Sequence, residues 1–155
     1  MIKVNVLSEE SSWSKKIKSK EILFNKVCNF FPKKYKFLNK KIYITLLLSN
    51  NKYIKKLNYK FKGKNKHTDI LSFPFNNYKS NIKEIYLGDI IISYNYINKP
   101  RNITNLQFKN KVIKIFIHGF LHLLGFDHIK FKDYKKMFNE EKRIFKFISK
   151  KIELN

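Results

Sequence analysis

TNLQFKNKVIKIFIHGFLHLLGFDH, residues 104–128, contains three of the four histidines and the longest apolar run of the chain. Apolar residues recur at helical spacing from Thr104 to Leu124, and Gly125 is the residue best able to take the left-handed conformation that ends a helix. The apolar run, residues 115–126, is shorter than the ~20 residues that a membrane-spanning helix needs. The stretch therefore predicts a long central helix in a protein that does not cross a membrane.

Four β-like segments and three further helices are expected around this helix. Alternating or β-branched apolar residues favour strands at 1–7, 42–48, 70–73 and 86–93. The combination predicts an α+β fold, a small mixed sheet of about four strands covered by about four to five helices.

The first of the further helices is expected to run from Trp13 to Phe31, where Pro32 closes it. The second begins after Ser49 or Asn50 and ends at Gly63. Its apolar face is expected to carry Tyr53, Leu57 and Phe61. The third starts near Phe131, and its inner face is expected to carry Tyr134, Met137, Phe138, Glu141, Ile144, Phe145 and Ile148.

The length of 155 residues suits one domain, and no repeat or linker interrupts it. Residues 1–155 are therefore predicted to form a single domain. Cys28 is the only cysteine, which excludes an intramolecular disulfide, and we expect it in the core. Cysteine usage favours a reducing compartment, and the polar segment 8–20 after a predicted strand argues against a signal peptide. A cytoplasmic location is expected.

The histidines define a candidate metal site at the end of the central helix. His118 and His122 are four residues apart, so they project from one face of a helix. The helix ends at Gly125, so the chain can fold back and bring His128 to the same centre. Three imidazoles with a fourth position open are typical of catalytic zinc sites, whereas structural sites are usually closed by four protein ligands.

A peptidase is the obvious alternative, because the H-E-x-x-H motif places two histidines at the same spacing. In that motif the residue after the first histidine is the glutamate general base, and here it is Gly119. Peptidase chemistry is therefore disfavoured. Zinc held by three neutral imidazoles gives hydroxide at neutral pH and suits hydrolysis of a phosphodiester, although nickel, cobalt or copper also fit such ligands.

HGFLHLLGFDH, residues 118–128, resembles the H-G-x-L-H-L-x-G-Y/F-D-H signature of the YbeY family, endoribonucleases that mature rRNA in bacteria and organelles. LNYKFKGK (57–64) and TDILSFP (68–74) resemble the family segment LNxxYRGKxxxTDVLSFP. LGDIIIS (87–93) resembles its LGDIVIS strand. The likeness, which includes Met137 and Glu141 in the last helix, covers roughly residues 40–145.

The resemblance implies a compact α/β fold and one Zn²⁺ per chain, held by His118, His122 and His128. It implies single-strand-directed RNA cleavage at the 3′ end of small-subunit (16S) rRNA and a role in ribosome quality control. His118 and Lys62 are the expected catalytic residues. The family has arginine at position 62, so the lysine keeps the charge but loses the bidentate fork. The alternative for Lys62 is a solvated surface residue.

Four other polar residues near these motifs have two interpretations each. Asp127 either orients an imidazole or caps the turn after Gly125. Asp69 with Thr68 either caps a loop or lines the cleft, and Asp89 either braces the site or is structural. We favour structural roles for Asp69, Thr68 and Asp89, and neither role for Asp127. His67 has no partner at metal spacing and is expected at the surface.

The 34 basic and 11 acidic residues give a net charge of +23, which favours a polyanionic partner, a nucleic acid or an acidic membrane surface. Because 32 of the basic residues are lysine and alanine is absent, drift toward A/T-rich codons is an alternative source of charge. Residues 22–68, however, contain 13 lysines and no acid, and residues 90–126 contain five basic residues and no acid. This distribution predicts salt-dependent binding to an RNA backbone. Side chains placed to stack on bases are Tyr53, Tyr59, Phe61 and Tyr78, with core packing favoured for Phe61.

The sequence as a whole predicts a metal-dependent endoribonuclease that binds single-stranded rRNA and the small ribosomal subunit, without a membrane or disulfide partner. Two other functions stay open. One is a non-catalytic assembly factor in which the metal only stabilises the fold. The lysine at position 62 gives this alternative some support. The other is a metal-dependent hydrolase for a different substrate.

Overall fold

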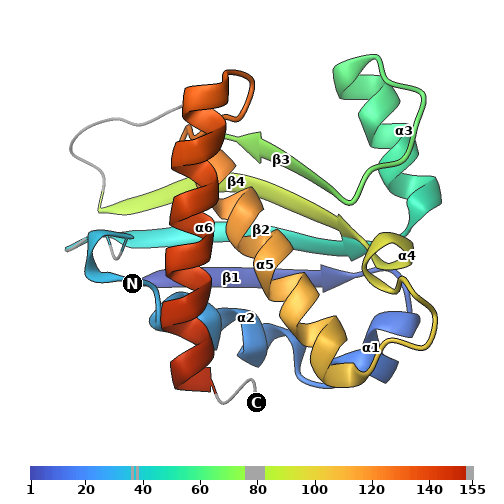
Figure 1. Cartoon of the computed structure of the whole chain (residues 1–155), viewed down its shortest axis with the longest axis horizontal. Coiled ribbons are helices and arrows are strands. Elements are labelled where there is room, and N and C mark those ends of the chain that lie inside the picture. Colours follow the sequence, from blue (N-terminus) through green and yellow to red (C-terminus); the bar gives the residue numbers. More distant parts are fainter. Residues whose placement is uncertain (36, 38, 76–82, 153–155) are drawn as a thin grey trace.

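A computed structural model describes residues 1–35, 37, 39–75 and 83–152 (Figure 1). The strands are β1 (Ile2–Ser8), β2 (Lys41–Ser49), β3 (Ile70–Pro74) and β4 (Glu84–Ser93). The α-helices are α1 (Ser12–Lys16), α2 (Lys20–Asn29), α3 (Asn51–Lys62), α4 (Tyr94–Ile97), α5 (Asn105–Leu123) and α6 (Phe131–Ile152), and a short 3-10 helix spans Lys33–Tyr35. No helix among the described residues is long and apolar enough to cross a membrane.

The four strands form one mixed sheet in the order β1-β2-β4-β3. β1, β2 and β4 are parallel, and β3 runs antiparallel to β4. Parallel neighbours need a crossover connection, which α1 and α2 supply between β1 and β2, and α3 together with β3 supplies between β2 and β4. The predicted α+β class with a small mixed sheet is confirmed.

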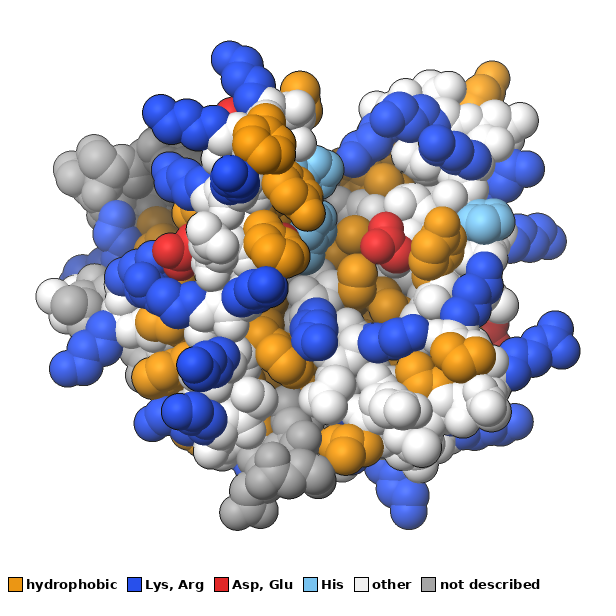
Figure 2. Space-filling view, viewed as in Figure 1, with side chains coloured by type: hydrophobic (Ala, Val, Ile, Leu, Met, Phe, Trp, Pro, Cys, Tyr) orange, Lys and Arg blue, Asp and Glu red, His pale blue; other side chains and the backbone are white. Residues whose placement is uncertain are grey.

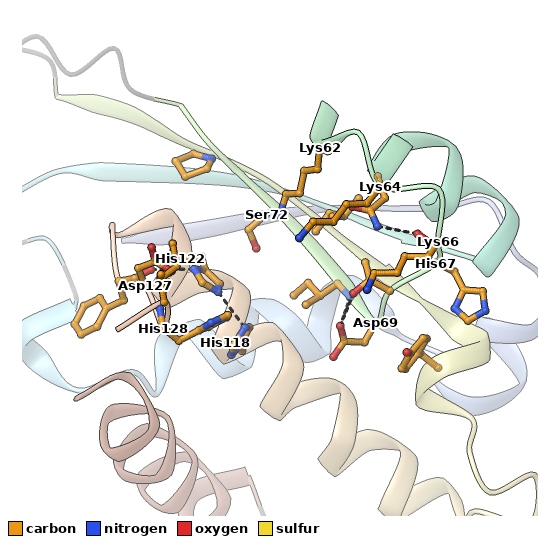
Figure 3. A pocket seen from close by; sticks show the side chains of 18 of the residues that line it. Lys62, Lys64, Lys66, His67, Asp69, Ser72, His118, His122, Asp127 and His128 are labelled. Carbon is orange, nitrogen blue, oxygen red and sulfur yellow. Dashed lines mark hydrogen bonds between the residues drawn. The ribbon is translucent and has the colours of Figure 1, made fainter. Parts of the chain in front are cut away.

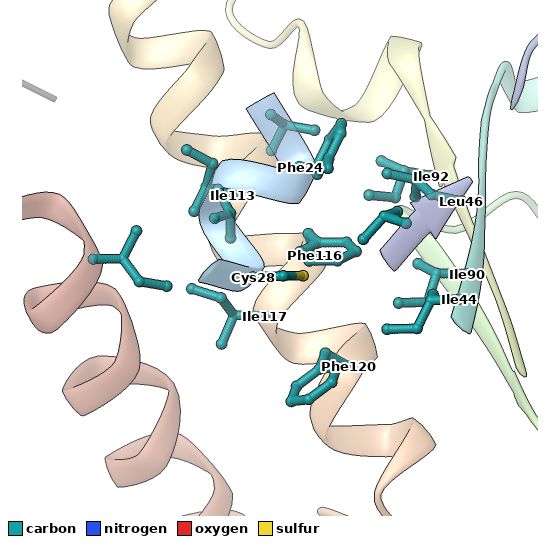
Figure 4. Close-up of a cluster of buried hydrophobic side chains, with 14 of the residues drawn as sticks. Phe24, Cys28, Ile44, Leu46, Ile90, Ile92, Ile113, Phe116, Ile117 and Phe120 are labelled. Atoms are coloured by element: carbon teal, nitrogen blue, oxygen red, sulfur yellow. The ribbon is translucent and has the colours of Figure 1, made fainter. Parts of the chain in front are cut away.

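Helices α2 and α5 pack on one face of the sheet with α6 packed against them, and α3 packs on the other face (Figure 1). The main core lies between α2, α5 and the sheet, where Phe24 and Phe116 meet Ile44 and Ile90 (Figure 4). Cys28 is buried in this core, as predicted. Successive strand residues point to opposite faces, so Ile91 belongs instead to the smaller cluster beneath α3.

Local signals fix both ends of α5. Thr104 and Gln107 form a reciprocal capping box, in which each side chain accepts a hydrogen bond from the other residue's backbone N–H. At the other end Gly125 has a φ of 84°, its N–H donates to the His122 carbonyl, and the Phe126 N–H donates to the Leu121 carbonyl. This Schellman arrangement ends the helix where the sequence predicts and turns the chain sharply.

The single helix expected from Trp13 to Phe31 is wrong. The chain leaves helical geometry at Ile17, whose backbone is extended, and α2 starts again at Lys20. A contact distant in sequence fixes α1 separately, because the Trp13 indole N–H donates to the Ser49 carbonyl at 3.0 Å. The apolar residues of both helices still reach the core.

Several aromatic residues expected inside are exposed. Phe61 is 57% exposed and contacts the Phe73 ring edge-on, because Ile54 and Asn58 form the buried side of α3. On α6, Met137, Ile144 and Ile148 are buried as predicted. Tyr134 and Phe138 are exposed, since that helix contacts α5 and α2 along one side only.

Candidate metal centre

The three histidines predicted as metal ligands lie together where α5 ends. His118 and His122 are one helical turn apart, and their Nε2 atoms are 3.0 Å from each other. The turn at Gly125 returns the chain so that the His128 ring lies 5.4 Å from the His118 ring and 4.9 Å from the His122 ring, between centroids. One nitrogen from each residue lies within 4.8 Å of the others, an arrangement that could hold a metal ion.

Two of the rings are oriented through their Nδ1 atoms. His118 Nδ1 lies 2.7 Å from Oε1 of Glu141 on α6, and His122 Nδ1 lies 2.9 Å from the carbonyl oxygen of Phe126. A carbonyl oxygen or a carboxylate only accepts, so each Nδ1 is the protonated donor, and in the neutral ring Nε2 then keeps its lone pair. Such partners fix the tautomer and orientation of metal-binding histidines.

When both rings are neutral, these tautomers place two Nε2 lone pairs opposite each other at 3.0 Å. Burial, and after it the neighbouring His118, lower the pKa of His122, which favours the neutral ring. A cation that accepts both lone pairs resolves this repulsion, and neutral imidazole is a preferred zinc ligand. The donor set therefore fits a metal ion of the zinc type.

A cleft of about 920 Å³ opens in front of the histidines. Lys62, Lys64 and Lys66 line it on the side opposite the histidines (Figure 3). Lys62 ends α3, and the next two belong to the loop that leads to β3. The structure thus brings Lys62 into the same cleft as the three histidines.

Asn58 holds this lysine loop in place. Its side chain is buried, and the side-chain amide donates to the Lys66 carbonyl at 2.7 Å, while the backbone carbonyl of Asn58 accepts from the Lys64 N–H at 3.3 Å. Gly63, with a φ of 64°, provides the left-handed residue that ends α3 and turns the chain. The backbone of the loop is fixed, while the lysine side chains project into solvent.

Gly119 lets α5 approach β3 closely. A Cβ atom at this position would lie 2.6 Å from Cδ1 of Ile70 and 3.0 Å from Oγ of Ser72. Ile70 and Ser72 also line the cleft. The strand that forms one wall of the cleft is therefore in direct contact with the helix that carries the first two histidines.

The remaining polar residues take the following places. Asp127 lines the cleft and its carboxylate accepts from the His128 N–H at 2.7 Å, so it caps the turn rather than orienting a described imidazole. Asp69 caps the start of β3 by accepting from the Ile70 N–H and the Thr68 hydroxyl, and both also line the cleft. Asp89 accepts from the hydroxyl of Tyr86. His67 is exposed as expected, at the edge of the cleft beside Tyr96.

Of the candidates for base stacking, Tyr59 and Phe61 are exposed on α3, and Tyr53 is half-buried. Tyr78 lies outside the described residues. Sequence reasoning missed Glu141 as a partner of His118, although an acid on the inner side of an amphipathic helix was a usable signal. It also missed the Phe126 carbonyl, for which a backbone acceptor gives no signal in side-chain chemistry.

The fold and the site define an α+β protein with a three-histidine cluster that could hold a metal, placed beside a lysine-lined cleft. A family model described as Endoribonuclease YbeY matches residues 6–149. The chain belongs to the YbeY family.

Individual relatives support this assignment. An Endoribonuclease YbeY from Pelagibacter ubique (strain HTCC1062) is 62% identical over 152 residues, which cover 98% of this chain and 99% of the relative. One from Persephonella marina is 37% identical over 106 residues, covering 68% of this chain and 69% of the relative. The solution structure of the Thermotoga maritima protein TM1509 shares the fold, with a TM-score of 0.56 at 24% identity over 97% of this chain and 91% of that one.

Proposed function

We propose that this protein is a metal-dependent endoribonuclease that cleaves single-stranded RNA. The observation that carries the proposal is the pair of Nε2 atoms 3.0 Å apart, both with their Nδ1 atoms engaged, at the edge of a cleft lined by lysines. The relatives named Endoribonuclease YbeY support the reaction class.

His118, His122 and His128 would hold one Zn²⁺ per chain. Bound there, zinc would supply hydroxide from water with a pKa near ~7 and stabilise negative charge on phosphate oxygens. Glu141 and the Phe126 carbonyl keep the two helical rings in the ligand tautomer. We assign His118 a part in catalysis as well as in metal binding, and its contact with the Glu141 carboxylate supports this choice.

Lys62 would place a positive charge opposite the histidines, where it faces the phosphate. Lys64 and Lys66 would hold neighbouring phosphates of the same strand. Ammonium groups on flexible stems recognise backbone charge rather than base edges, so sequence preference would come from how the RNA is presented. Binding should weaken steeply with salt.

The natural substrate we propose is the 3′ end of 16S rRNA, with the small ribosomal subunit as the particle that presents it and ribosome quality control as the wider role. The family resemblance supports this choice, and so does the acid-free distribution of lysines at residues 22–68. We further propose that residues 1–155 act as one domain and work in the cytoplasm.

The test compares the purified protein with its His122→Ala variant on single-stranded RNA, each with and without a chelator. We expect the zinc-loaded protein to cleave the RNA and the variant to cleave it at least about a hundredfold more slowly. This loss exceeds the ~10–100-fold that follows removal of a residue that only hydrogen-bonds a metal ligand. Chelation should reproduce the loss, and added zinc should restore only the parent protein. Metal content measured on the same samples should fall in the variant.

His67→Ala is the matched control, because His67 lies on the same cleft without joining the metal cluster. Cleavage that persists unchanged in His122→Ala would indicate a contaminating nuclease and would contradict the proposal that this protein is an endoribonuclease. If neither protein cleaves but both bind small ribosomal subunits, the non-catalytic assembly factor is the correct interpretation.

A further inference from the structure

An exposed aromatic row lies along α6 beside the metal centre. It consists of Phe131, Tyr134 and Phe138, spaced by three and four residues, with exposed fractions between 38% and 72%. The Tyr134 and Phe138 rings are stacked, 15° from parallel with their centroids 5.8 Å apart. We call Phe131, Tyr134 and Phe138 the α6 stripe. Large exposed aromatic rings in a row mark an interaction surface.

The α6 stripe continues directly from the metal centre. Glu141, which bonds His118, is seven residues after Tyr134 and therefore lies along the same side of the helix. At the other end, His128 and the exposed Ile129 line the cleft immediately before α6 begins. Figure 2 shows hydrophobic side chains over this part of α6 next to the histidines at the edge of the hollow. An RNA strand that leaves the cleft past His128 would meet the α6 stripe.

The charges around the α6 stripe favour a polyanion. The Lys135 ammonium lies 4.7 Å from the centre of the Phe131 ring, and the Lys142 ammonium lies 4.2 Å from the centre of the Phe138 ring. The acids of α6 are engaged elsewhere or face elsewhere: Glu140 pairs with Lys34, Glu141 bonds His118, and Asp133 is not on the side of the stripe.

Lysine is depleted in protein–protein interfaces, whereas aromatic rings alternating with cations are the usual surface for single-stranded nucleic acid. We infer that the α6 stripe is a stacking track for the segment of single-stranded RNA that leaves the cleft, with Lys135 and Lys142 on its phosphates. The inference rests on the proposed function for its substrate class. It adds a second binding surface, distinct from the lysines of the opposite wall.

The variant that tests the track is Phe131→Leu/Tyr134→Leu/Phe138→Leu, which keeps apolar bulk and removes the ring faces. All three residues are exposed, so the fold is expected to persist. Phe147→Leu is the matched control: Phe147 is an exposed aromatic of α6 with Lys151 5.1 Å from its ring centre, and it lies nine residues, two and a half turns, from Phe138.

Binding is measured by fluorescence anisotropy on chelated protein, with a labelled single-stranded RNA long enough to leave the cleft, and again with a dinucleotide. We expect the triple variant to bind the long RNA about tenfold more weakly or worse, with the dinucleotide and the Phe147→Leu control unchanged. A 4-thiouridine cross-link from the long RNA should fall within residues 131–142.

Equal binding of long RNA by the triple variant and the control would overturn the track. So would an equal loss on the dinucleotide, which would mean that the stripe acts through the metal centre. Unchanged RNA binding with weaker binding to purified small ribosomal subunits would assign the stripe to a protein surface and overturn the RNA assignment. Because binding is measured without turnover, the experiment tests whether the α6 stripe binds RNA even if the protein cleaves no RNA and the proposed function fails.

Discussion

The two walls of the cleft are built in opposite ways. On the histidine wall, His118 and His122 are held by hydrogen bonds of 2.7 and 2.9 Å to atoms of α6 and of the turn after α5. On the lysine wall, hydrogen bonds from the side chain and the backbone carbonyl of Asn58 fix the loop, but the charged ends of Lys62 and Lys64 extend into solvent. The difference teaches that one wall depends on the position of single atoms and the other on the amount of charge.

The largest effect expected from this contrast is at Glu141. Glu141→Ala removes the acceptor of His118 Nδ1–H, so the ring is free to turn or change tautomer. We expect metal affinity to fall about 10–100-fold, as is typical for the loss of such a partner. Competition with a chromogenic zinc chelator measures it.

Glu140→Ala is the matched control from the neighbouring position. Burial opposes ionisation of Glu140, but hydrogen bonds from Lys34 and Tyr35 outweigh it and lower the pKa of Glu140. This variant should lose thermal stability while keeping metal affinity. If both variants lose metal to the same extent, the histidine wall is not positioned through Glu141.

A smaller effect is expected at Lys62. Lys62→Ala should slow cleavage of single-stranded RNA about tenfold, since one charge facing the phosphate is removed from a wall that keeps two others. Lys62→Arg should cleave at least as fast as the parent, because charge is what this wall supplies and arginine adds a bidentate fork. Initial rates at low salt measure both.

Lys132→Ala, on the exposed start of α6, controls for the loss of a positive charge anywhere on the surface. Equal, minor losses at positions 62 and 132 would remove Lys62 from the mechanism. A large loss in Lys62→Arg would show that the lysine wall also depends on the position of single atoms, and the contrast between the walls would not hold.

The smallest effect is a pH dependence of stability in the chelated protein. Burial, followed by the adjacent His118, lowers the pKa of His122 below its ordinary value of about 6.5. As pH falls through that value, the unfolded chain binds a proton at this ring that the folded chain does not, so stability decreases toward the lower folded pKa. Urea unfolding on either side of pH 6.5 measures the slope.

The contribution of His122 is the difference between the slopes of unfolding free energy against pH for the parent and for His122→Asn, because the variant has no titrating ring at this position. Glu140 contributes in a separate window: its lowered pKa adds stability that is lost only as pH falls below about 4.3. The same slope near pH 6.5 in parent and variant would show that His122 is not held neutral by its surroundings.

The parts predicted correctly from sequence depend on local signals. Apolar spacing located the start of α5 near Thr104, where a local capping box lies, and Gly125 marked its end. The pairing of His118 with His122 follows from helix periodicity, and the left-handed glycine explains how His128 returns. The alternation of β-branched residues was enough to find the four strands of the sheet.

The parts predicted wrongly or missed depend on contacts distant in sequence. The break between α1 and α2 accompanies the bond from Trp13 to Ser49, which are 36 positions apart. The bond between His118 and Glu141 spans 23 positions and exists only because α6 packs on α5. Tyr134 and Phe138 were expected inside because an amphipathic pattern shows an apolar side, but only packing shows how wide a side is covered.

The close contact at Gly119 also limits how this scaffold can evolve. Zinc peptidases with two histidines at this spacing carry their glutamate base at the corresponding position, directly after the first histidine. Here a Cβ atom alone would lie 2.6 Å from Cδ1 of Ile70, so any larger side chain first requires the Ile70 side chain to move. A glutamate at position 119 would therefore displace side chains that line the cleft. The packing of α5 against β3 thus disfavours a peptidase base at this position.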